Sequence, residues 1–98
     1  MIKHTKIIST LGPATSDLVS LKALIKAGVN LVRLNFSHGT AQEHIDRAQL
    51  VRQAAKELNT EVGILADLQG PKIRIARFKT SKVVLQLGQT FTLDAELD

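Results

Sequence analysis

The chain has 98 residues, 44% of them hydrophobic, which is enough for one globular domain and unlike the composition of a disordered protein. It contains no cysteine, so disulfides, thiolate metal sites and sulfur nucleophiles are excluded. Its net charge of +4 suits anionic small molecules, nucleic acid or an acidic partner equally well, but scattered basic residues and only three aromatic residues argue against nucleic acid. No apolar run approaches the roughly 20 residues of a membrane span, and the N-terminus lacks the apolar segment of a signal peptide. We therefore expect a cytoplasmic protein with no membrane partner.

The spacing of apolar residues predicts three strands separated by two helices. The strands are predicted at residues 6–11, 30–36 and 61–66, and the third is so apolar that we expect it to be buried on both faces. The first helix follows the cap hydroxyls and acid of residues 15–17 and ends at Gly28, a suitable left-handed C-terminal residue. The second begins with the capping-box pattern of residues 40–43 and ends near residues 59–60. This β-α-β-α-β order predicts an α/β fold with parallel neighbouring strands and right-handed crossovers.

The pattern changes after Asp67. Gly70 and Pro71 interrupt the chain, and no helical period follows them. Residues 83–87 and 90–93 flank Gly88-Gln89 in the manner of a β-hairpin. We therefore predict one structural unit over residues 1–70 and the start of a β-rich unit over residues 71–98.

Polar side chains gather where the predicted strands end. Since parallel strands end on the same edge of a sheet, these side chains are expected to lie together, as they do in the sites of α/β proteins. Within the second strand, Leu31, Arg33 and Asn35 share one face because strand side chains alternate, and Val32, Leu34 and Phe36 share the other. The edge collects Thr10, Gly12, Arg33, Asn35, Ser37, His38 and Asp67.

The chemistry of this edge leaves several interpretations open. The fork of Arg33 suits a phosphate or a carboxylate, but it equally suits an internal salt bridge. The edge also offers three hard oxygens, with one negative charge, from Asn35, Ser37 and Asp67. This set is enough for a weak cation site but not for a tight divalent one. The Asp67 carboxylate is alternatively an acceptor for backbone N–H groups. His38 is either a hydrogen-bonding loop residue or a general base, and Arg74 is alternatively a solvated strand residue.

Three stretches resemble the opening motifs of the pyruvate kinase family, in that family's order and spacing. They are residues 6–15 (KIISTLGPAT), 32–39 (VRLNFSHG) and 66–74 (ADLQGPKIR), and the resemblance covers essentially the whole chain. It implies the first three strands of a TIM (β/α)8 barrel, followed by the β-rich lid domain that family members insert after the third strand. It also implies a glycolytic activity, the transfer of the phosphoryl group of phosphoenolpyruvate to ADP, giving pyruvate and ATP.

The resemblance also assigns roles to individual residues. It places Arg33 on the phosphate of phosphoenolpyruvate. It places Asn35, His38 and Arg74 on the nucleotide side, where ADP or ATP would bind. Around a monovalent cation it places Asn35, Ser37, Asp67 and the backbone carbonyl of Leu68.

The family's catalytic lysine and the acidic ligands of its Mg²⁺ belong to later strands. We therefore expect this chain to be a fragment that does not turn over alone. The resemblance implies a homo-oligomer, a homotetramer for full-length members. With sheet edges open at its first and third strands, the isolated piece is expected to self-associate, exchange strands or rearrange.

The third motif departs from potassium-dependent members of the family. Those members resemble one another in having Thr-Lys after the aspartate, Glu after Gly-Pro, and Thr three residues later. This chain has Leu68-Gln69, Lys72 and Ile75 at these places. That set resembles the potassium-independent branch, in which a lysine can supply the charge of K⁺. We therefore expect no requirement for K⁺, with a merely solvated Lys72 as the alternative.

Two other functions remain open. One is a non-catalytic βαβαβ module that binds a phosphorylated ligand or a protein partner, for which Arg33 is equally suitable. The other is a different barrel enzyme acting on phosphoenolpyruvate or pyruvate. The pair of motifs at residues 32–39 and 66–74 argues against this second alternative.

Overall fold

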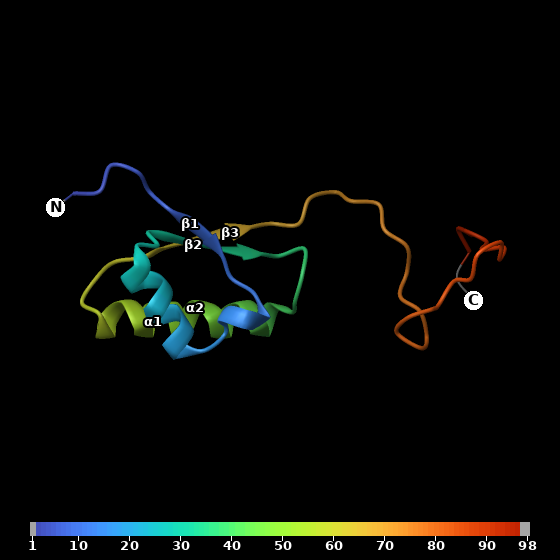
Figure 1. Ribbon diagram of the computed structural model, residues 1–98. Coiled ribbons are helices and arrows are strands. Elements are labelled where there is room, and N and C mark those ends of the chain that lie inside the picture. Colours follow the sequence, from blue (N-terminus) through green and yellow to red (C-terminus); the bar gives the residue numbers. More distant parts are fainter. Residues whose placement is uncertain (1, 97–98) are drawn as a thin grey trace.

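A computed structural model describes residues 2–96. A three-stranded parallel sheet in the order β1-β2-β3 is covered on one face by two helices (Figure 1). The strands are β1 (Ile8–Thr10), β2 (Leu31–Asn35) and β3 (Gly63–Asp67). The helices are α1 (Leu18–Ala27) and α2 (Ala41–Glu57), with a short 3-10 helix, η1 (Pro13–Thr15), after β1. The predicted order of strands and helices is confirmed, and η1 is an addition.

The register of the sheet brings the carboxyl ends of the strands together. Thr10 at the end of β1 pairs with Arg33 of β2, and Asn35 at the end of β2 pairs with Asp67 of β3. The predicted parallel pairing of sequential strands is therefore confirmed.

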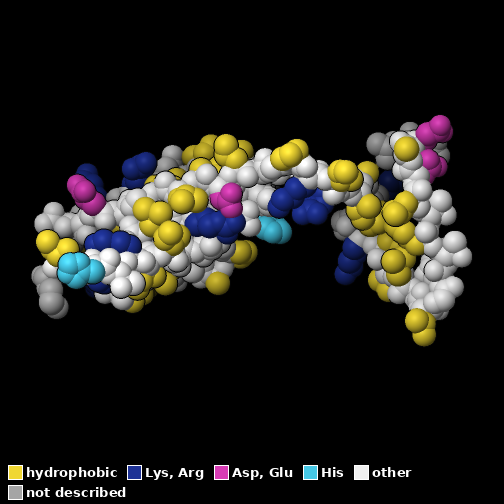
Figure 2. Space-filling view, turned by 90° about the horizontal axis from the view of Figure 1, so that it is seen from above, with side chains coloured by type: hydrophobic (Ala, Val, Ile, Leu, Met, Phe, Trp, Pro, Cys, Tyr) yellow, Lys and Arg dark blue, Asp and Glu magenta, His cyan; other side chains and the backbone are white. Residues whose placement is uncertain are grey.

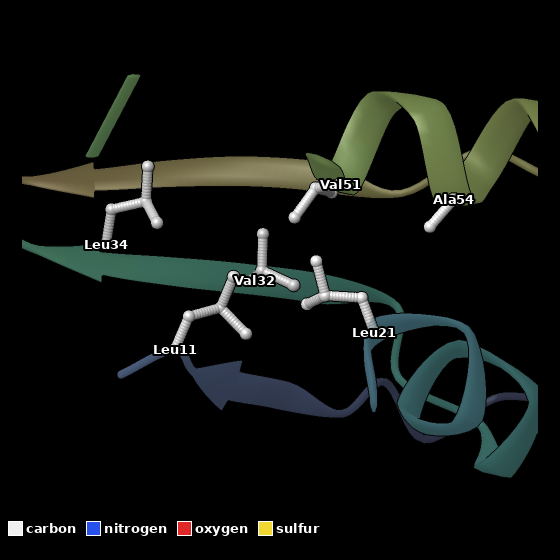
Figure 3. Close-up of a cluster of buried hydrophobic side chains, with 6 residues drawn as sticks. All are labelled: Leu11, Leu21, Val32, Leu34, Val51 and Ala54. Atoms are coloured by element: carbon white, nitrogen blue, oxygen red, sulfur yellow. The ribbon is translucent and has the colours of Figure 1, made fainter. Parts of the chain in front are cut away.

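The core lies between the sheet and the helices (Figure 3). Val32 and Leu34 of β2 point into it and are buried, whereas the alternate residues of the strand are only half-buried. This confirms the predicted alternation of faces in β2. The buried cluster consists of Leu11, Leu21, Val32, Leu34, Val51 and Ala54.

The opposite face of the sheet is uncovered. Ile8 of β1 and Leu65 of β3 are exposed, with 58% and 39% of their surface accessible. The prediction that the third strand is buried on both faces is therefore wrong for this chain. Its apolar composition reflects two potential packing faces, but the two helices supply a cover for only one of them.

The helix termini follow the predicted capping chemistry with one correction. In α2 the capping box forms, because Glu43 N–H donates to Thr40 Oγ1 (3.3 Å) and Thr40 N–H donates to Glu43 Oε2 (2.6 Å). In α1 the N-cap is Asp17 itself, not a hydroxyl, and its carboxylate accepts the Ser20 N–H at 2.8 Å. Gly28 closes α1 with φ of 118°, as predicted.

These caps make stability depend on pH. The Ser20 backbone N–H lowers the pKa of Asp17 below its ordinary 3.8. A carboxyl with a lowered folded-state pKa stabilises the fold fully above its unfolded pKa, and this contribution is lost as the pH falls through the folded value. We expect Asp17→Asn to lower the thermal unfolding midpoint at neutral pH, with the difference from the unaltered chain closing as the pH falls below about 3.8.

The midpoints are to be measured by circular dichroism over a pH series. Glu61→Gln removes an exposed carboxylate outside the helices and serves as the matched control. A difference between Asp17→Asn and the unaltered chain that stays constant down to low pH would contradict the capping role.

The C-terminal segment, residues 68–96, extends away from the layered part (Figure 1). It contains no helix or strand, so the predicted hairpin strands at 83–87 and 90–93 are wrong for this chain. The turn between them does form, because Gln89 N–H donates to the Gln86 carbonyl and Gly88 has φ of 79°. Val84 and Leu87 are exposed, so the apolar side chains have no second layer on which strands could pack. The predicted boundary at residue 70 stays a prediction.

Candidate functional site

The guanidinium of Arg33 spans the carboxyl edge of the sheet. Its Nε donates to Asp67 Oδ2 at 3.0 Å, and its Nη2 contacts the same oxygen. Its Nη1 donates to Thr10 Oγ1 at 3.3 Å. One arginine of β2 is therefore tied to the ends of both neighbouring strands.

This ion pair is not sealed from solvent. The side chain of Arg33 is 33% exposed and that of Asp67 is 44% exposed. A pair with that exposure contributes at most about 1 kcal/mol to stability. Arg33 thus makes an internal salt bridge, one of its two predicted alternatives, and the partner is Asp67, whose carboxylate accepts from the guanidinium. The partly exposed Arg33 remains accessible to an incoming anion at the same edge.

The predicted cation-binding oxygens have local partners. Asn35 Oδ1 accepts the Ser37 N–H at 3.0 Å, which fixes the turn after β2. Ser37 Oγ accepts a long hydrogen bond from Lys72 Nζ at 3.4 Å. The structure therefore brings a lysine ammonium from the C-terminal segment to one of the predicted oxygen ligands.

His38 lies in the turn that follows β2, and its N–H donates to the Asn35 carbonyl at 3.2 Å. It lines a cleft of about 380 Å³ between the β1–η1 connection and the start of α2. Gly12, Asn35 and Arg47 are also part of this lining. The structure thus joins Asn35 and His38 in one cleft at the carboxyl edge of the sheet.

Arg74 and Leu68 do not join that cleft. Arg74 lines a separate hollow of about 620 Å³ within residues 73–96, together with Phe78 and Phe91. Leu68 is exposed immediately after β3. Basic side chains and a histidine nevertheless gather at the end of the layered part from which the C-terminal segment extends (Figure 2).

Sequence reasoning missed three residues of α2 that border the cleft. Arg47 Nε donates to Ser16 Oγ at 3.0 Å and links α2 to the segment after η1. The Thr40 backbone N–H lowers the pKa of Glu43, so its carboxylate is charged at neutral pH. His44 is buried in the first turn. The sequence did carry a signal for the burial of His44, because His44 lies about one helical turn before Ala48 on the apolar side of α2.

Two kinds of feature are absent from residues 2–96. No group of three or more His, Asp or Glu side chains there is placed to hold a metal ion. Within the same residues, no helix is both long and apolar enough to cross a membrane.

Comparison with known proteins decides the family. The family model described as the pyruvate kinase barrel domain matches residues 2–98. The chain belongs to the pyruvate kinase family. This confirms the resemblance drawn from the three sequence motifs.

Individual pyruvate kinases match over nearly the whole chain. Those of Buchnera aphidicola subsp. Baizongia pistaciae and Haemophilus influenzae are 54% and 53% identical to it over 96 residues, which is 98% of this chain and 20% of each relative. The crystal structure of Cryptosporidium parvum pyruvate kinase superposes with a TM-score of 0.73 at 42% identity, covering 80% of this chain and 16% of that one. The chain thus spans about one fifth of the curated pyruvate kinases it matches.

Proposed function

We propose that this chain supplies the phosphate-binding arginine and part of the cation site of a kinase that transfers the phosphoryl group of phosphoenolpyruvate to ADP. In that reaction the bond between phosphorus and the enol oxygen breaks, and a bond forms to a terminal oxygen of ADP. The resulting enolate takes up a proton and becomes pyruvate. The observation that carries the proposal is the position of Arg33, which is partly exposed at the carboxyl edge between Thr10 and Asp67.

The chemistry of phosphoryl transfer suits such an edge. The reaction demands positioning and charge neutralisation more than covalent work by protein groups. Arg33 offers a planar, permanently charged donor set that matches phosphate oxygens. Its links to β1 and β3 hold the guanidinium in place before substrate arrives, which lowers the entropy lost on binding.

In the proposed complete enzyme, β1 to β3 are the first three strands of a (β/α)8 barrel, and residues 71–98 begin its lid domain. The uncovered sheet face, with Ile8 and Leu65 exposed, supports this, because the interior of such a barrel is a packed core. The same face and the open strand edges support self-association of the 98 residues on their own. For the complete enzyme we propose a cytoplasmic homo-oligomer.

The residues present do not fit Mg²⁺ by themselves. Asp67 is the one carboxylate among the predicted oxygens, and it is paired with Arg33. The Lys72 ammonium beside Ser37 repels a divalent ion. We propose that Mg²⁺, which neutralises phosphate charge in this reaction, is held by residues outside this chain, so that the 98 residues alone do not turn over.

We propose further that Lys72 replaces K⁺. Its Nζ lies 3.4 Å from Ser37 Oγ, where a monovalent cation is expected from the family resemblance. A unit positive charge from a side chain supplies the same long-range attraction for phosphate as a bound K⁺. The enzyme would then work without added potassium.

The test uses a hybrid kinase, defined as the Haemophilus influenzae relative with its matching segment replaced by this chain. We expect the hybrid to be active in potassium-free buffer, with tetramethylammonium as the counter-ion. Lys72→Glu should lower kcat about 10- to 100-fold there, since an attraction at the site becomes a repulsion. Added K⁺ should restore part of this loss.

The matched control is Lys79→Glu, which reverses an exposed charge elsewhere in the C-terminal segment. The potassium proposal is wrong if the unaltered hybrid loses its activity when K⁺ is withdrawn. It is also wrong if both charge reversals have the same effect.

A further inference from the structure

We propose that His44 is a positioning residue that holds the turn at residues 36–39, and so sets the nucleotide side of the site. The ring is 4% exposed and lies in the first turn of α2. Its Nε2 lies 2.6 Å from the carbonyl oxygen of His38. Because a carbonyl oxygen only accepts hydrogen bonds, Nε2 carries the proton.

The other ring nitrogen fixes the form of the imidazole. Nδ1 is buried, and within residues 2–96 it has no hydrogen-bond partner. A proton there would leave a buried donor unsatisfied. The geometry therefore selects the form with the proton on Nε2 and none on Nδ1, which is able to donate to the His38 carbonyl.

A second contact acts on the same turn. The ring of His44 stacks on Phe36, with centroids 4.3 Å apart and planes inclined by 20°. Phe36 and His38 are two residues apart, so one side chain holds the turn both by stacking and by a hydrogen bond.

Gly39 shows how closely the turn approaches α2. Its φ is +77°, and a Cβ there would lie 3.4 Å from His44 Nε2 and 2.9 Å from Glu43 Oε2. The turn thus follows a close path over the first turn of the helix. His38 and Gly39 line the cleft of about 380 Å³, so the position of the turn controls the shape of that cleft.

The effect on catalysis rests on the proposed function and on the family resemblance, which places Asn35 and His38 of this cleft on the nucleotide side. Arg33 lies within β2, where the sheet holds it independently of His44. Loosening the turn should therefore weaken nucleotide binding more than phosphoenolpyruvate binding. This difference between the effects on the two substrates distinguishes a positioning role from a general loss of structure.

Two variants isolate the hydrogen bond. His44→Phe keeps an aromatic ring that can stack on Phe36 but has no donor. His44→Gln loses the ring but places an amide N–H near the position of Nε2. His4→Phe, at an exposed histidine, is the matched control.

In the unaltered hybrid kinase labelled with ¹⁵N at its histidines, long-range ¹H–¹⁵N spectra should show Nε2 of His44 protonated and Nδ1 bare. In the hybrid kinase, His44→Phe should raise the KM for ADP about fivefold, with kcat and the KM for phosphoenolpyruvate changed by less than about twofold, as expected for one lost hydrogen bond. His44→Gln should recover most of the affinity for ADP, and His4→Phe should leave it unchanged.

Several results would overturn the inference. A proton on Nδ1 contradicts the tautomer, and this measurement needs no variant to fold. An unchanged KM for ADP in His44→Phe, a failure of His44→Gln to recover it, or an equal loss for both substrates contradicts positioning. An inactive hybrid with the unaltered segment would count against the proposed function instead, and the ring spectrum would still decide the tautomer and its hydrogen bond.

Discussion

Replacing Arg33 by methionine in the hybrid kinase should lower kcat/KM for phosphoenolpyruvate by about 100- to 1,000-fold. Losing one preorganised charged donor at a transferring phosphoryl group has an effect of that size. Arg33→Lys should be intermediate, because an ammonium keeps the charge but cannot make two parallel hydrogen bonds. The fold should change little, because the ion pair of Arg33 with Asp67 is partly solvated.

Steady-state kinetics with each substrate varied in turn, together with thermal unfolding, measures both effects. Arg52→Met is the matched control, since Arg52 is an exposed arginine on α2. If Arg33→Met retained the activity of Arg52→Met, the phosphate-binding role of Arg33 would be disproved.

Replacing Leu21 by alanine should destabilise the fold by about 3 kcal/mol. Leu21 is 1% exposed and belongs to the buried cluster between α1 and the sheet. Truncating a buried leucine removes its transfer free energy and leaves a cavity, at a typical cost of about 2–5 kcal/mol. Since small domains are stable by only about 5–15 kcal/mol, the variant should lose a large part of its stability margin.

Val19→Ala is the matched control on the same helix, because Val19 is 79% exposed. It should change the free energy of unfolding by less than about 0.5 kcal/mol. Urea unfolding followed by circular dichroism gives both values. Equal destabilisation by the two variants would show that α1 does not pack on the sheet as described.

Several elements of the fold could be predicted from sequence because their signals are local. The alternation in β2, the capping box at Thr40 and the left-handed Gly28 each depend on a few neighbouring residues. The meeting of Asn35 with Asp67 also followed, because parallel sequential strands must end on one edge.

What sequence could not supply depends on contacts between distant residues. The choice of Asp67 as the partner of Arg33, 34 residues away in the sequence, needs the register of their two strands. The hydrogen bond from His44 to the His38 carbonyl needs the path of the turn over α2. The predicted hairpin around Gly88 has turn chemistry in its favour, but strands form only where another layer covers their apolar side chains.

The most direct measurement is pyruvate formation from phosphoenolpyruvate, ADP and Mg²⁺, made in parallel with the 98-residue chain and with the hybrid kinase, with and without K⁺. We predict that the hybrid forms pyruvate in both buffers and that the 98 residues alone form none, even at high protein concentration. A folded hybrid that forms no pyruvate would contradict the assignment of the phosphate and cation groups to this chain. Turnover by the 98 residues alone would show that the chemistry is carried by residues other than those proposed.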